Sequence, residues 1–161
     1  MLSPGRGERR RMPQSYAKLY YHIVFSTHDR VPQISGEIKH RLYEYVSGIL
    51  RNKDCKLIKA GGTADHIHLL AILSREVSVS EILRDIKTNS SKWIHVTFAE
   101  SAEFVWQRGY GAFTVGFRDV DRVARYIEIQ EEHHRTKTFK EEFVELLNAH
   151  DVEYDLKYLW E

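Results

Sequence analysis

The chain has 161 residues, of which 42% are hydrophobic and 29% charged, and this balance is typical of one globular domain with its own core. The net charge of +1 gives no global signature of nucleic-acid binding, so any such surface must be a local patch. A single cysteine, Cys55, excludes an internal disulfide and fits a reducing, cytoplasmic setting. We find no apolar run near the ~20 residues of a membrane span and no apolar signal-peptide segment.

Two parts of the chain differ in composition. Residues 1–15 are rich in arginine, glycine and proline, which predicts a disordered basic arm or a start-codon extension. Such an arm could touch phosphate, or it could be only a solvated tail. Residues 16–161 carry all the strand and helix patterns, and we expect them to form a single domain.

The first half of this domain predicts a strand, a helix and a short second strand. Residues 20–27 are aromatic and β-branched, as strands are. Ser35 is of the type that caps helices, and an apolar stripe at helical spacing runs over residues 38–50. Residues 56–60 predict the second strand, which the pair Gly61-Gly62 lets bend before the next one.

The next strand carries two histidines. His66-Ile67-His68 leads into an aliphatic run with no helical period, which predicts a strand. Alternation places His66 and His68 on one face, close enough to hold a single ion. The alternative is that one histidine belongs to the core and the other to the surface.

A second helix and a last strand follow. Ser78 and Glu81 form a capping box, and the helix behind it has one apolar face. Its other face is polar and basic and carries Arg84, Lys87, Asn89, Ser91 and Lys92. This face is either only solvated or a surface for phosphate contacts. Residues 106–117 predict the last strand, in which Phe113, Val115 and Phe117 share a face.

The element order is β, α, β, β, α, β, which predicts an α+β fold of the ferredoxin-like kind. Two helices are then expected to cover one face of a four-stranded antiparallel sheet, with the histidine pair on the opposite, open face. A third helix, capped by Asp119 or Asp121, is expected near that face. Tyr126 and Gln130 lie four residues apart on it and project from the same side. The alternative is that Tyr126 merely covers the sheet and Gln130 lies on the surface.

The C-terminal part predicts another helix and a docked tail. Thr138 and Glu141 form a capping box before an apolar stripe of Phe143, Leu146 and Leu147. Residues 154–160 are too apolar to stay free in water, so we expect them to pack on the domain or on a second subunit.

Four motifs appear in this order: His66-Ile67-His68 after Gly61-Gly62, the segment 89–94 (NSSKWI), the segment 106–111 (WQRGYG) and the segment 126–134 (YIEIQEEHH). Together they resemble the small single-tyrosine transposases of the HUH superfamily. These are the short insertion-sequence transposases and the REP-associated tyrosine transposases. The resemblance covers residues 16–161.

The resemblance implies a role for each matching residue. His66 and His68 correspond to the metal-binding pair, Gln130 to the third metal ligand and Tyr126 to the nucleophile. The family uses Mg²⁺ or Mn²⁺, although two imidazoles and an amide would suit Mn²⁺ or Zn²⁺ on ligand grounds alone. The chain departs from many relatives at residues 116–119 (GFRD), where they have a serine-rich turn, and this leaves details of DNA contact open.

The expected activity is nicking and rejoining of single-stranded or hairpin DNA through a 5′-phosphotyrosine and a free 3′-hydroxyl. The ester keeps the bond energy, so no nucleotide cofactor is expected, and no phosphate-cradling glycine loop is present in the sequence. The residues proposed to contact DNA are Arg30, Lys87, Asn89 and Lys92.

Two alternatives remain from the sequence. The first is a domesticated enzyme that processes repeat hairpins. The second is a non-catalytic single-strand binder that stacks bases on Tyr21, Phe25 and Phe113. Relatives of the transposase type are homodimers in which the tyrosine helix completes the partner's metal site, whereas domesticated relatives can be monomers, so we expect a homodimer.

Overall fold

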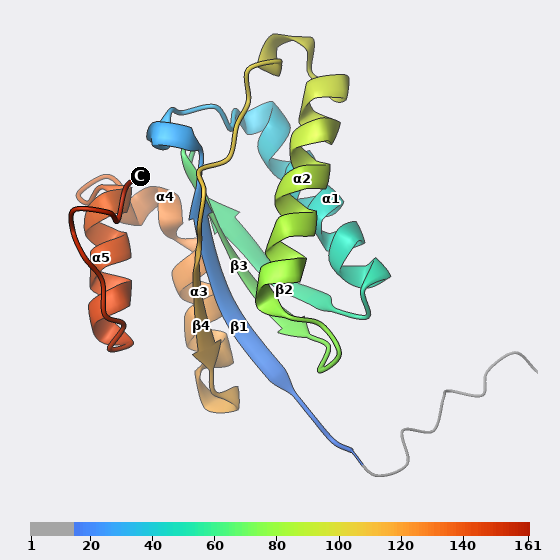
Figure 1. The fold of residues 1–161 in the computed structure, drawn as a ribbon, viewed down its shortest axis with the longest axis vertical. Coiled ribbons are helices and arrows are strands. Elements are labelled where there is room, and N and C mark those ends of the chain that lie inside the picture. The colour runs from blue at the N-terminus through green and yellow to red at the C-terminus, as the bar shows by residue number, and fades with distance from the viewer. Residues whose placement is uncertain (1–14) are drawn as a thin grey trace, which may run out of the picture.

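The sheet forms from the segments with alternating and β-branched residues. The structure, a computed structural model, describes residues 15–161 (Figure 1). The strands are β1 (Leu19–Ser26), β2 (Lys56–Gly62), β3 (His66–Leu73) and β4 (Gly111–Val115). They pair antiparallel in the order β2-β3-β1-β4, which confirms the predicted ferredoxin-like topology. The basic arm predicted at the N-terminus lies, except for Ser15, outside the described residues.

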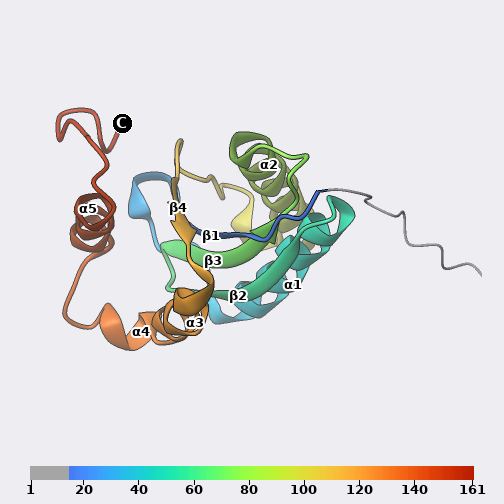
Figure 2. The same cartoon turned by 90° about the horizontal axis from the view of Figure 1, so that it is seen from below.

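Helices lie on both sides of this sheet. They are α1 (Gly36–Asn52), α2 (Val79–Thr97), α3 (Val120–Glu128), α4 (Gln130–His133) and α5 (Phe139–Ala149), with short 3₁₀ turns at 28–30, 99–101 and 117–119. Figures 1 and 2 show α1 and α2 on one side and α3, α4 and α5 on the other. None of the described helices is long and apolar enough to span a bilayer.

The hydroxyls of the two predicted capping boxes do cap their helices and define where these helices begin. The Ser78 hydroxyl accepts from the Glu81 amide at 3.2 Å, and the Thr138 hydroxyl accepts from the Glu141 amide at 3.3 Å. Ser35 caps α1 in the same way, through the Ile38 amide. Each cap satisfies an amide that the first helical turn leaves without a partner.

Two separate cores hold the layers together. The larger one fills the space between the sheet and α1 and α2, with Ile23, Leu42 and Leu69 among its fully buried members. The smaller core lies under α5 on the other face and consists of Val24, Phe113, Phe139 and Leu147. Partly buried side chains pack against it, and these are Phe143, Leu146, Tyr154, Leu159 and Trp160. The apolar tail therefore docks on the domain itself, one of the two predicted places.

The last strand is shorter than predicted. It spans Gly111–Val115, whereas we expected residues 106–117. Gly109 has a φ of 81°, a left-handed conformation that suits glycine and turns the chain just before the strand. Trp106 makes only an isolated bridge to Thr27, and its indole nitrogen donates to the Ser90 hydroxyl at 3.0 Å.

The tyrosine helix also differs from the prediction at both ends. Asp119 holds the N-cap position of α3, but its side chain makes no capping bond and instead pairs with Arg122 at 3.2 Å. The helix ends at Glu128, because Ile129 leaves helical geometry with φ −95° and ψ 19°. Gln130 is therefore the first residue of α4 and does not lie on the tyrosine helix.

The sheet face predicted to be open is covered. His66 and His68 have no exposed surface, because side chains of α3, α4 and α5 contact them. The reason is that α5 carries its own apolar stripe and buries it on β1 and β4. Any substrate must therefore approach between or beneath these helices.

Candidate active site

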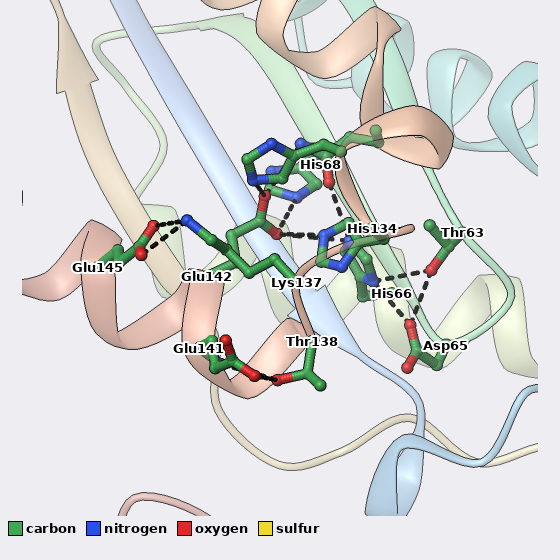
Figure 3. Close-up of polar contacts among 12 residues, drawn as sticks. Thr63, Asp65, His66, His68, His134, Lys137, Thr138, Glu141, Glu142 and Glu145 are labelled. Carbon is green, nitrogen blue, oxygen red and sulfur yellow. Dashed lines mark hydrogen bonds and ion pairs between the residues drawn. The ribbon is translucent and has the colours of Figure 1, made fainter.

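The histidine pair is held by partners on the neighbouring strand and turn. β3 directs both imidazoles to the face under α3 and α5, as alternation predicted. The His66 Nδ1 donates to the Asp65 carboxylate at 2.7 Å, and the Thr63 hydroxyl donates to the same oxygen at 2.8 Å (Figure 3). Burial acts against ionisation of Asp65, but these hydrogen bonds outweigh it and lower its pKa. The carboxylate thereby fixes the His66 ring with Nε2 toward the site.

His68 is fixed in a similar way by a residue that we did not predict. Its Nδ1 lies 2.8 Å from the Nε2 of His22 on β1, and the two rings stack. Burial lowers the pKa of His22 to about 3 and that of His68 to about 4, the latter despite the hydrogen bond that His68 donates to Glu142, which acts in the opposite direction. Both rings are therefore neutral at pH 7, the state in which imidazole binds a metal.

Gln130 reaches the same place from α4. Its Oε1 lies 3.1 Å from His66 Nε2, and its side chain is 1% exposed. The Gln130 amide nitrogen donates to Glu142 at 3.1 Å, which turns its oxygen toward the histidine. In the tautomer whose single ring hydrogen lies on Nδ1 and is donated to Asp65, the Nε2 of His66 carries a lone pair that faces the Gln130 oxygen. Two acceptors facing each other at this distance fit a cation between them.

Tyr126 projects from α3 toward the histidines. Its ring makes an edge contact with His68 at 5.8 Å between centroids, and its hydroxyl donates to the Glu142 carboxylate. Burial raises the pKa of this hydroxyl, and the hydrogen bond to Glu142 raises it further. The tyrosine is therefore neutral and held in place, with its oxygen beside the histidine pair.

Glu142 on α5 is the residue that joins the site, and sequence reasoning missed it. One oxygen lies 2.9 Å from His68 Nε2 and 3.0 Å from His134 Nε2, and the side chain is 1% exposed (Figure 3). Burial disfavours its charge, yet the hydrogen bonds from His134 and His68 outweigh this effect and hold the pKa of Glu142 well below its usual range. The hydrogen bond between His134 and Glu142 also raises the pKa of His134, against the effect of burial.

A sequence signal for Glu142 did exist. It lies three residues after Phe139 and four before Leu146, so it falls inside the apolar stripe of its helix. A carboxylate in such a stripe is buried on docking and needs a charged or hydrogen-bonding partner. His134 carried no comparable signal, because it follows α4 and reaches the site only through the turn before α5.

The collected donors have the chemistry of a divalent metal site. One donor atom from each of His66, His68, His134 and Glu142 can be chosen so that all lie within 4.8 Å of one another. Neutral imidazoles, an amide oxygen and a carboxylate together suit first-row divalent cations. The predicted ligands His66, His68 and Gln130 are thus brought together, with Tyr126 beside them.

The comparison with protein families gives the second line of support. A family model described as "Transposase IS200 like" matches residues 15–130. The chain belongs to the family of IS200-like transposases. The resemblance predicted from the four motifs is thereby confirmed at the level of the family.

Relatives and solved structures agree with this membership. The transposase of the insertion sequence element IS200 from Salmonella typhimurium is 28% identical over 130 residues, which cover 77% of this chain and 84% of that protein. The ISDra2 transposase of Deinococcus radiodurans is 22% identical over 118 residues, covering 70% and 84%.

Two solved structures share the fold of this transposase. A putative transposase from Deinococcus radiodurans superposes with a TM-score of 0.60 at 21% identity, covering 80% of this chain and 98% of that one. A REP-associated tyrosine transposase bound to a REP hairpin superposes with a TM-score of 0.58 at 16% identity, covering 83% and 74%. At these identities the likeness concerns the fold alone.

The proposed DNA contacts of the transposase fall in two regions. Asn89 and Lys92 are exposed on α2, on the far side of the sheet from the histidines. Lys87 donates to the carbonyl oxygens of Gln107 and Gly109, and burial lowers its pKa to about 8. No contact of these three side chains with Tyr126 is found in the described structure, so any DNA that they bind lies away from the Tyr126 hydroxyl.

Arg30 lines a pocket together with Asp65 and Phe139, next to the histidine pair. Its guanidinium carbon is 5.5 Å from the centroid of the Trp160 ring, and its side chain is 14% exposed. Its Nη1 is buried without a hydrogen-bond partner among the described residues, so it could still donate to a phosphate. The base-stacking role considered for Phe25 and Phe113 does not fit, because these rings are 1% and 4% exposed within the two cores.

Proposed function

We propose that this transposase nicks and rejoins single-stranded DNA through a 5′-phosphotyrosine on Tyr126, with Mg²⁺ or Mn²⁺ held by His66, His68 and Gln130. It is expected to work in the cytoplasm. The observation that carries the proposal is the meeting of the Tyr126 hydroxyl, the imidazoles of His66 and His68 and the Gln130 amide around one buried carboxylate, in a chain of the IS200-like family.

The reaction needs little beyond what these side chains supply. The Tyr126 oxygen forms a bond to phosphorus while the bond from phosphorus to the 3′ oxygen breaks, and the proton lost by the tyrosine is balanced by the one gained by the 3′-hydroxyl. When bound, the cation neutralises the phosphodiester and polarises phosphorus. Asp65 and His22 keep the imidazoles oriented, and Glu142 holds the tyrosine hydroxyl near them.

A labelled oligonucleotide tests this proposal. With a 3′ label, we expect Mn²⁺-dependent transfer of the label to the protein, stable in detergent, because the tyrosine keeps the 5′ phosphate of the downstream fragment. With a 5′ label, the label should appear only on a shortened strand that ends in a 3′-hydroxyl. Binding without either product, in Mn²⁺ as in chelator, would instead support a non-catalytic binder.

Substrate form gives a further prediction. We expect stronger binding and faster nicking of single strands or hairpins than of a blunt duplex, because the half-buried Tyr126 cannot reach a phosphate held between paired strands. Affinity should fall with rising salt as cationic side chains such as Arg30 release counterions from phosphate. Fluorescence anisotropy with matched labelled oligonucleotides measures the affinities and their dependence on salt. Equal affinity for blunt duplex and hairpin would contradict the prediction.

The homodimer expected from the family resemblance is also part of the proposal, with one revision. Tyr126 lies beside the histidines of its own chain, which supports a site complete within each subunit. We therefore expect a His66→Ala chain and a Tyr126→Phe chain, unfolded and refolded together, to remain inactive in nicking. Partial recovery of nicking in the mixture would mean that the tyrosine acts on the partner's metal site.

A domesticated enzyme that processes repeat hairpins is the second candidate. The same single-chain site favours it, since such an enzyme could act as a monomer. Both candidates share the chemistry, so their substrates decide between them. A nicking assay should compare repeat hairpins from the host chromosome with the ends of an adjacent mobile element.

A further inference from the structure

Glu142 belongs to a helix that the family match does not include. The family model ends at residue 130, whereas α5 spans Phe139–Ala149. Phe139 and Leu147 of this helix belong to the smaller core and hold the helix against the sheet. Glu142 therefore lies between α3 and the sheet, in contact with Tyr126 and His68. Burying a charge is costly without compensation, and here hydrogen bonds from histidine, tyrosine and glutamine side chains stabilise the Glu142 carboxylate inside the site.

We propose that Glu142 is a ligand of the divalent cation and that its second oxygen positions the Tyr126 hydroxyl. The proposal deepens the proposed function, since it concerns the same metal site, and it makes α5 part of that site. It names a ligand that the family resemblance did not supply.

The spacing of the donor atoms supports ligation. Mg²⁺ holds its ligands at about 2.0–2.1 Å in octahedral geometry, so neighbouring donor atoms lie about 3 Å apart. His66 Nε2 and Gln130 Oε1 are 3.1 Å apart, and His68 Nε2 and Glu142 Oε1 are 2.9 Å apart. The separation between His66 Nε2 and Glu142 Oε1 is 3.5 Å. These four atoms thus have spacings close to those of neighbouring ligands.

The chemistry of the donor set points the same way. His66, His68 and Gln130 are neutral donors, and hard cations such as Mg²⁺ favour carboxylate oxygen. Glu142 adds that oxygen with its negative charge. This addition removes the mismatch between the three ligands predicted from the sequence and the metals that the family uses.

The two oxygens of Glu142 have separate partners. One faces the imidazoles of His68 and His134, and the other accepts from the Tyr126 hydroxyl and the Gln130 amide. A single carboxylate thereby sets the position of the nucleophile relative to the metal. Glu142 is a positioning residue for Tyr126 and a ligand for the cation.

The competing explanation is that Glu142 is a plug, occupying the place of the scissile phosphate until α5 moves. The two explanations predict opposite effects on metal affinity. Removing a ligand weakens binding, whereas removing a plug leaves binding unchanged or strengthens it. Measurement of the metal alone, without DNA, therefore separates them.

The test is titration of the full chain with Mn²⁺ by isothermal calorimetry. We expect Glu142→Gln to weaken Mn²⁺ binding at least about tenfold, as loss of a charged ligand should. The matched control is Glu145→Gln on the same helix, whose carboxylate pairs with Lys137 in solvent and which should bind Mn²⁺ within about twofold of the wild type. Binding by Glu142→Gln as tight as the wild type, or tighter, would overturn the proposal.

A second variant separates ligation from the field of the charge. Glu142→Asp keeps the charge but withdraws the oxygens by one methylene, so we expect it to weaken Mn²⁺ binding as well. Wild-type affinity in Glu142→Asp would reduce Glu142 to a nearby charge and overturn ligation. Circular dichroism melting of each variant confirms folding. The side-chain amide in the Glu142→Gln variant keeps an oxygen that can accept from the Tyr126 hydroxyl.

The outcomes also distinguish this inference from the proposed function. If the wild type forms no covalent DNA adduct while Mn²⁺ binding depends on Glu142, the function is wrong and the metal ligand stands. If the adduct forms and Mn²⁺ binding ignores Glu142, only the ligand assignment is wrong.

Discussion

Tyr126→Phe should abolish the covalent protein–DNA adduct and reduce nicking by about 10⁴-fold or more, while DNA affinity stays within about twofold. The change removes only the attacking oxygen. The ring still makes its edge contacts with His22 and His68, so packing under α3 is retained. Gel separation of the adduct measures the first effect, and fluorescence anisotropy with a labelled single strand measures the second.

The control for this variant is another hydroxyl outside the site. Tyr158→Phe changes an exposed tail tyrosine, which should leave both adduct yield and affinity as in the wild type. Adduct formation at the wild-type level in Tyr126→Phe would mean that another residue is the nucleophile.

The metal ligands should show the other large effect. We expect His66→Ala and His68→Ala each to eliminate nicking and Mn²⁺ binding, and Gln130→Ala to weaken both. Each histidine is a fully buried donor, whereas Gln130 contributes a neutral amide oxygen that water can replace. Nicking assays with added Mn²⁺ and with chelator, together with calorimetry, measure these losses. Full activity of either histidine variant in chelator-treated buffer would refute the site.

Loss of fold must be separated from loss of chemistry in these variants. Removing His66 or His68 takes one partner away from the buried Glu142 carboxylate, which typically costs about 1–3 kcal/mol of stability. His66→Gln and His68→Gln keep volume and a hydrogen-bond donor, so they should melt closer to the wild type while still binding Mn²⁺ more weakly. His40→Ala on the surface of α1 is the control for histidine loss itself.

The sequence was most informative where a local rule decides the structure. Alternation in residues 66–73 placed both histidines on one face, and the hydroxyls of Ser78 and Thr138 marked the starts of α2 and α5. The element order was enough to predict the ferredoxin-like sheet. These features depend on neighbours in the chain, so no tertiary contact was needed to find them.

The sequence was least informative where tertiary contacts decide. Helical spacing from Tyr126 to Gln130 predicted one helix, but the break at Ile129 lets Gln130 start α4 and still reach His66. The open face was predicted because α5 could not be placed from its stripe alone. Glu142 was missed for the same reason, since its partners lie far away along the chain on β3.

The central claim is that Tyr126 becomes the covalent attachment point for DNA, and peptide mapping of the trapped adduct tests it most directly. Trypsin cleavage after Arg125 and Arg135 releases residues 126–135, which contain Tyr126 as their only tyrosine. We expect mass spectrometry to find the 5′-phosphorylated oligonucleotide fragment on Tyr126 of this peptide, and we expect the released strand to be extendable from its 3′-hydroxyl. An adduct on any other peptide, or a released strand that ends in a 3′ phosphate, would contradict this claim.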